Sequence, residues 1–178
     1  HWLTIPVMRQ NLKNKKIEKK IDNTNKWRKK HYKSIQFSYQ NHKYFYDIQP
    51  LINRLENGHH DFLCDLNIEM IKDICNLLDI NTDKIFVSSD LNKKGSRSEK
   101  LLEIIRNFKC DTYLSPSGSK AYIEKDKLLP NSDINILYQK FYPKEYKQLN
   151  VKSFISHLSV LDVIANIGKS ETKNYIRN

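Results

Sequence analysis

The chain has 178 residues, 39% of them hydrophobic, which is enough for a domain with a buried core and argues against a disordered chain. No apolar run approaches the roughly 20 residues that a membrane-spanning helix needs. The formal net charge is +11, from 31 Lys and Arg against 20 Asp and Glu. Because the basic residues are scattered along the sequence, we do not expect a nucleic-acid partner, whereas an anionic small molecule would be attracted by this charge.

The first predicted element is a strand in residues 1–8, "HWLTIPVM", where bulky and small residues alternate before Pro6. The sequence begins inside this strand and has no initiator methionine. We therefore expect the chain to be a fragment that lacks an N-terminal segment.

A helix is predicted from about Asn25 to Tyr39. Three of its residues recur at intervals of four and share one face: Trp27, His31 and Ile35. An imidazole beside an indole would be partly desolvated, so His31 is a candidate general base near neutral pH. The alternative is a histidine that only packs or faces solvent.

The remaining predicted elements alternate between helices and short strands. In chain order they are a helix near 48–55, a helix over 65–78, a strand in 83–91, a helix within 93–110, a strand just before the loop at 115–120, a strand in 133–141 and a last helix from about Ser153 to just before Gly168. This alternation predicts an α/β fold with a mostly parallel, short-stranded sheet flanked by helices. We expect one domain over residues 1–178.

Ligands of open α/β sheets usually bind beyond the carboxyl ends of the strands, and the loop "YLSPSGSKAY" follows a predicted strand in that way. Its hydroxyls, backbone amides and positive charge could hold an anion: Ser115, Ser117, Gly118, Ser119 and Lys120. The loop matches neither a P-loop nor a dinucleotide fingerprint. The choice between a phosphate-binding loop at the main pocket and an ordinary turn stays open.

The last helix carries three polar residues at i, i+3 and i+7: Ser159, Asp162 and Asn166. They lie beside an expected core stripe of Phe154, Leu158, Leu161 and Ala165. We expect the three polar residues to face inward, as a buried network or a pocket wall. A buried Asp162 would then need donors, which the loop amides or Lys120 could supply.

Three cysteines, Cys64, Cys75 and Cys110, lack metal-ligand spacing. We interpret them as reduced thiols of a cytoplasmic protein. No metal site and no nucleophile triad is indicated.

The order of several segments resembles that of the WbqC-like protein family, over nearly the whole chain. These segments are "HWLTIPV", Trp27 with His31, "DTYLSPSGSKAYI", "YPKEYKQL" and "LSVLDVIANIG". Family members usually begin earlier, with a segment that is absent here. The chain also departs from the family at Pro116, where a glycine is usual, and at Ala165, where an aromatic residue is common.

The resemblance implies modification of an activated amino sugar for surface glycans such as O-antigens. The expected reaction is N-acylation of a nucleotide-linked 4-amino-4,6-dideoxyhexose of the viosamine type. Acetyl-CoA or another activated acyl donor would be a co-substrate, with no cofactor bound. The alternative is a non-catalytic module that binds a nucleotide-sugar or a glycan.

For that reaction a base must take a proton from the amine, and donors must stabilise an oxyanion. His31 or Asp162 is the candidate base. The residues expected to bind the substrate are Ser115, Ser117, Gly118, Lys120, Tyr122, Tyr146, Gln148, Ser159 and Asn166.

Overall fold

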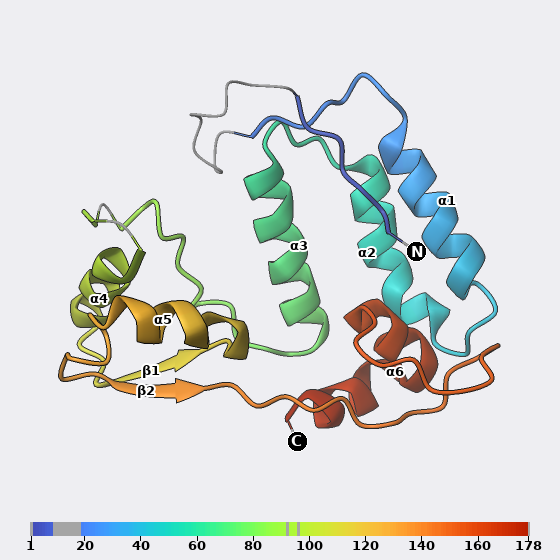
Figure 1. The fold of residues 1–178 in the computed structure, drawn as a ribbon. Coiled ribbons are helices and arrows are strands. Elements are labelled where there is room, and N and C mark those ends of the chain that lie inside the picture. Colours follow the sequence, from blue (N-terminus) through green and yellow to red (C-terminus); the bar gives the residue numbers. More distant parts are fainter. Residues whose placement is uncertain (1, 9–18, 92, 96, 178) are drawn as a thin grey trace. The chain divides into compact units, whose positions relative to one another are not determined.

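A computed structural model describes residues 2–8, 19–91, 93–95 and 97–177 (Figure 1). The chain forms two compact units, and each is described by itself. Unit 1 comprises His1–Asp83 with Pro143–Asn178, and unit 2 is Lys84–Tyr142. The predicted class is confirmed, because helices accompany a short parallel sheet. The single domain stays a prediction.

Unit 1 contains four helices in its described residues: α1 (Trp27–Tyr39), α2 (Phe45–Asn57), α3 (Leu63–Leu77) and α6 (Val160–Arg177). The helix α2 packs against each of the other three. Its sequence explains this position, because apolar residues recur around more than one side of it. The buried residues of α2 are Phe45, Ile48, Leu51, Ile52 and Leu55.

None of the helices in the described part of the chain has both the length and the apolarity needed to cross a membrane.

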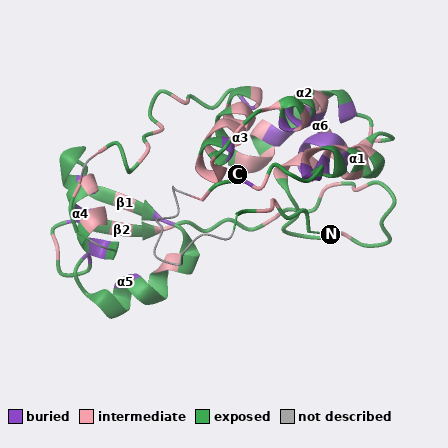
Figure 2. Cartoon of the chain, turned by 90° about the horizontal axis from the view of Figure 1, so that it is seen from above, coloured by how far each residue is buried: buried purple, intermediate pink, exposed green. Residues whose placement is uncertain are grey.

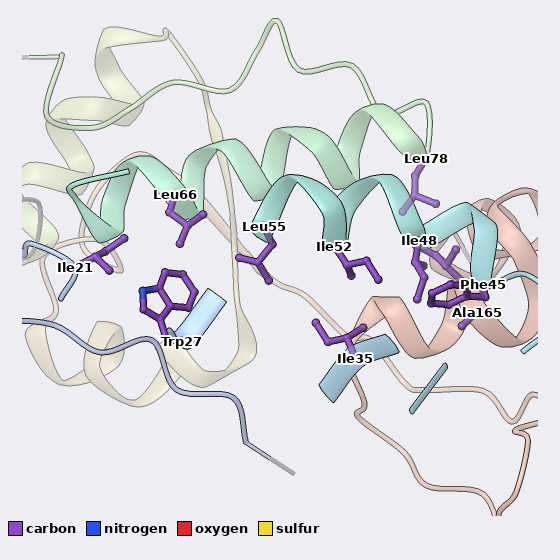
Figure 3. Close-up of a cluster of buried hydrophobic side chains, with 11 residues drawn as sticks. Ile21, Trp27, Ile35, Phe45, Ile48, Ile52, Leu55, Leu66, Leu78 and Ala165 are labelled. Atoms are coloured by element: carbon purple, nitrogen blue, oxygen red, sulfur yellow. The ribbon is translucent and has the colours of Figure 1, made fainter. Parts of the chain in front are cut away.

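The core of unit 1 is a continuous apolar cluster (Figure 3). The predicted face of α1 is confirmed, because Trp27, His31 and Ile35 are all buried. Leu66 of α3 and Leu78, just after this helix, are buried, whereas Ile71 is 52% exposed and does not belong to the core. Figure 2 shows buried residues on α1, α2 and α6, three of the helices that contribute to this cluster.

Unit 2 is a small βαβ arrangement preceded by the helix α4 (Arg97–Asn107). Strand β1 (Thr112–Ser115) leads through a 3-10 turn, η2 (Ser117–Ser119), into α5 (Lys120–Asp126) and then β2 (Asn135–Tyr138). The two strands are parallel, with Tyr113 opposite Ile136. A separate core joins α4, α5 and one face of this sheet, and its buried members are Leu102, Ile105, Ile123, Leu129 and Ile134.

Two predicted strands do not form ladders. In the described residues 2–8, Val7 makes only an isolated bridge with Ile21. Residues 83–91 contain turns at 83–84 and 88–91 but no strand, and the ring centroids of Phe86 and Phe108 lie 4.6 Å apart. Among the described residues neither segment pairs with a strand along its length, so a short run of alternating or apolar residues was not sufficient to predict a strand.

The last helix also differs from its prediction. It begins at Val160, not near Ser153, and it continues past Gly168 after a kink. At the kink Gly168 has φ +83° and ψ 161°, a conformation that is essentially reserved for glycine. A Cβ at this position would lie 2.9 Å from Tyr44 Cδ1. The kink therefore lets the helix backbone approach an aromatic ring of unit 1 closely.

We predict that Gly168→Ala destabilises the protein by roughly 1–3 kcal/mol, from backbone strain plus the clash with Tyr44. Thermal and urea denaturation measure the change. Gly118→Ala is the control, since a Cβ there meets nothing within 4 Å. Equal stability of the two variants would contradict this account of the kink.

Candidate functional site

The buried carboxylate of Asp162 is the centre of a polar network in unit 1. The residue lies in the first turn of α6 and is 6% exposed. Tyr146 Oη donates a hydrogen bond of 2.6 Å to Asp162 Oδ2, and Gln148 Nε2 donates one of 3.1 Å to the same oxygen. The expected burial is confirmed. The expected donors were wrong, because neutral side chains supply the bonds and Lys120 pairs with Glu124 instead.

The same network fixes the segment that precedes α6. Gln148 Oε1 accepts from the backbone N–H of Ile155 at 2.8 Å, and Gln148 Nε2 donates to the carbonyl of Ile155 at 2.9 Å. Asn166 Oδ1 accepts from the N–H of Leu149 at 2.9 Å. Four predicted site residues, Tyr146, Gln148, Asp162 and Asn166, therefore lie together and hold this segment against α6.

Ser159 does not belong to the inward stripe that the sequence predicts. It is exposed and precedes the first residue of α6. Its Oγ accepts from the N–H of Leu161 at 3.3 Å, which is the geometry of a helix N-cap. Since the helix begins only after Ser159, Phe154 and Leu158 also lie outside it, and Leu158 is 43% exposed.

Tyr39 is a member of this network that sequence reasoning missed. Burial raises the pKa of its phenol well above the usual range, and the charge of the nearby Asp162, with a hydrogen bond between the two, raises it further. The pKa of Tyr146 is raised as well, mainly by burial and then by its bond to Asp162. Both phenols therefore stay protonated donors at neutral pH. The signal for Tyr39 was its place four residues after Ile35, on the stripe that contains His31.

His31 lies in the core beside Trp27, with ring centroids 5.1 Å apart. Its Nε2 is 3.2 Å from the carbonyl oxygen of Thr4, which can only accept, so Nε2 carries the proton. Burial lowers the pKa of His31, and the bond to Thr4 opposes this shift. The two candidate bases have separate partners: Asp162 bonds to Tyr146, and His31 bonds to a backbone carbonyl.

The serine-rich loop joins β1 to α5 in unit 2. Ser115 is fully buried, and its Oγ donates to the carbonyl of Pro116 at 3.4 Å. Ser117 and Gly118 are exposed. Lys120 Nζ lies 3.7 Å from Glu124 Oε1 and 5.7 Å from the centre of the Tyr138 ring. The loop thus offers Ser117 and the backbone at Gly118 to a ligand, whereas the hydroxyl of Ser115 points into the unit.

Unit 2 contains a pocket of about 920 Å³, which we call the tyrosine pocket. Its lining includes two phenol rings, three cations and one carboxylate: Tyr113, Tyr122, Arg97, Lys100, Lys125 and Asp126. Of the predicted substrate-binding residues that the structure describes, Tyr122 alone is among those that line it. The expectation that the serine-rich loop lines the main pocket stays a prediction.

The cations of the tyrosine pocket were missed because lysine and arginine on a helix are usually solvent-facing. Their spacing was nevertheless a signal. Arg97 and Lys100 are three apart on α4, and Tyr122 and Lys125 are three apart on α5, so each pair shares a face. Cations beside aromatic rings suit a ligand with an anionic group and a flat ring system.

Among the described residues, no group of three or more His, Cys, Asp or Glu side chains could hold a metal ion.

Comparison with known proteins identifies a matching family and a distant relative. The model of the WbqC-like protein family matches residues 1–174. A protein of Mycobacterium tuberculosis, described as "Uncharacterized protein Rv1507c", is 24% identical over 178 residues, which is 99% of this chain and 75% of that protein. No solved structure matches the chain.

We predict that Tyr146→Phe destabilises the protein by about 1–3 kcal/mol, because the buried Asp162 carboxylate loses a donor that water cannot replace. Chemical denaturation measures the change. Tyr46→Phe is the matched control, since Tyr46 is 79% exposed in the same unit. If both variants lose the same stability, the hydroxyl of Tyr146 is not an anchor.

A second prediction concerns pH. The pKa of folded His31 lies below its usual value of 6.5, so the unfolded chain binds a proton that the folded chain resists. Stability is then fully present above about pH 6.5 and falls as the pH drops towards 5, by at most about 1.4 kcal/mol per pH unit. His31→Gln keeps a donor for Thr4 but cannot titrate. We expect urea midpoints of the wild type to fall more steeply with acid than those of the variant, and parallel profiles would refute this.

Proposed function

Because the chain belongs to the WbqC-like protein family, and this membership suggests a role in polysaccharide or amino-sugar biosynthesis, we propose that it is a transferase that modifies a nucleotide-linked amino sugar. The proposed reaction is N-acylation of a 4-amino-4,6-dideoxyhexose, with acetyl-CoA or an aminoacyl donor as co-substrate. The tyrosine pocket is the observation that supports a nucleotide-linked substrate most directly.

The chemistry of that pocket matches the parts of a sugar nucleotide. Arg97, Lys100 and Lys125 can neutralise a diphosphate, and the guanidinium of Arg97 can bind a phosphate through two hydrogen bonds. The rings of Tyr113 and Tyr122 offer surfaces to a base. The volume of about 920 Å³ lies within the range of roughly 300–1,000 Å³ that is common for ligand sites.

In the proposed reaction the amine nitrogen of the sugar attacks the acyl carbonyl of the donor. A C–N bond forms, the C–S bond of a thioester donor breaks, and the thiol leaves with the proton that the amine gives up through a base. His31 or Asp162 is proposed as that base. Ser117 and the amides near Gly118 are exposed donors that suit a phosphate or an oxyanion.

A binding module without turnover is the second candidate, and one observation favours it. Both proposed bases already have partners, since Asp162 accepts from Tyr146 and Gln148, and the proton of His31 Nε2 goes to a backbone carbonyl. A carboxylate with this set of donors is typical of a structural anchor. Such a module would bind the nucleotide-sugar and present it to another protein.

Turnover separates the two candidates. The purified chain is incubated with thymidine-diphosphate-linked 4-amino-4,6-dideoxyglucose and acetyl-CoA, and mass spectrometry follows the sugar nucleotide. We expect a product heavier by one acetyl group, and no product from thymidine-diphosphate-linked glucose, which lacks the amine. Saturable binding without product would support the binding module. Absence of both binding and product would refute both candidates.

Substitutions test which residues bind the sugar nucleotide and whether Asp162 acts as the base. Lys100→Gln should weaken binding of the sugar nucleotide about tenfold, because one charge-assisted bond to phosphate is lost. Lys109→Gln, an exposed cation just after α4, is the control. Asp162→Asn with turnover lost and fold intact would identify a base, whereas a loss of about 3 kcal/mol in stability would identify an anchor.

A further inference from the structure

A second hollow adjoins the tyrosine pocket in unit 2. It measures about 470 Å³ and is lined by Arg97, Glu99, Asp126, Lys127, Leu128 and Asn131, and we call it the polar pocket. Arg97 and Asp126 line both hollows. A ligand that extends from one hollow into the other would therefore pass these two side chains, which carry opposite charges.

Arg97 and Asp126 do not neutralise each other. Within the residues that the structure describes, neither side chain makes a hydrogen bond or an ion pair. On the same helices Arg106 lies 3.5 Å from Asp133, and Lys120 pairs with Glu124. The two residues at the boundary of the hollows thus remain able to bind a ligand that has a negative and a positive group.

The local backbone also argues against a purely structural role for them. Arg97 has φ +47°, in the left-handed region that costs a non-glycine residue free energy. Asp126 is the last residue of α5, where the negative end of the helix dipole repels a carboxylate. Placements that oppose local preference in this way concentrate at binding sites.

We propose that the two hollows bind a zwitterionic ligand, a sugar phosphate with a free amine, with Arg97 on the phosphate and Asp126 on the ammonium group. The amide of Asn131 and the charges of the polar pocket suit the sugar hydroxyls. This inference deepens the proposed function, on which its link to a nucleotide rests, by naming the two residues that select an amino sugar over a neutral one.

The experiment uses simple probes, so that it does not depend on a nucleotide. Calorimetric titration compares glucosamine 6-phosphate with glucose 6-phosphate, which lacks the amine, and with glucosamine, which lacks the phosphate. We expect the zwitterion to bind at least about tenfold more tightly than either analogue, because each analogue lacks one charge-assisted contact. Equal binding of all three by the wild-type chain, or no binding, would overturn the proposal.

Two variants locate the contacts. Asp126→Asn should abolish the preference for glucosamine 6-phosphate over glucose 6-phosphate, and it should leave the melting temperature unchanged or slightly higher. Arg97→Asn, which tolerates a positive φ, should abolish the preference over glucosamine. A preference that survives either substitution would overturn that assignment.

For each variant, a control removes the same type of charge at another position in unit 2. Glu124→Gln removes a carboxylate of α5 that pairs with Lys120. Lys109→Asn removes a cation that also has a positive φ, +52°. Both should keep the wild-type preference. Amine-dependent binding without acyl transfer would leave this inference standing and refute the transferase, whereas acyl transfer with no effect of Asp126→Asn would refute the inference alone.

Discussion

The apolar surface of α2 is the constraint on which unit 1 depends. Ile48 and Ile52 are essentially inaccessible to solvent, and such burial contributes about 1.5–3 kcal/mol for each side chain. The apolar residues of α2 can be buried only by neighbouring elements, so α1, α3 and α6 all pack against this helix. The positions of these three helices, and hence of Asp162 on α6 and His31 on α1, follow from that requirement.

A polar interaction complements this apolar one at the start of α6. Burying the Asp162 carboxylate is costly unless donors surround it, and Tyr146 and Gln148 lie where the chain returns to unit 1 from unit 2. The apolar contacts of α6 would tolerate several positions of that returning segment. The hydrogen bonds allow only one of these positions, because only one register of the segment places Tyr146 and Gln148 on the same carboxylate oxygen.

Strong periodicity made parts of the fold predictable. The spacing of Trp27, His31 and Ile35 identified the buried face of α1, and the short runs around Tyr113 and Ile136 identified β1 and β2. Residues 83–91 were misassigned, because a short apolar run does not by itself distinguish a strand from a packed turn. For the same kind of reason the glycine at 168 suggested a helix end, whereas the chain kinks and continues.

The candidate site was only partly predictable, for a different reason. The contact between Tyr146 and Asp162 joins residues 16 apart across an irregular segment, and no helical or strand period encodes it. Asp162 was selected by its spacing with Ser159 and Asn166 on the last helix, whereas Tyr146 was selected through the family resemblance. The cations of the tyrosine pocket have a helical period, but nothing in the period distinguishes a charged pocket wall from a charged surface.

The chain order of unit 1 has a consequence for synthesis on the ribosome. The backbone N–H of Lys169, in α6, bonds to Asp47 Oδ2, in α2, across 122 residues. All of unit 2 is therefore translated before α6 emerges to complete the cover of α2. Until then the part of the α2 surface that α6 covers stays exposed in the nascent chain, and exposed apolar surface of this kind favours aggregation during folding.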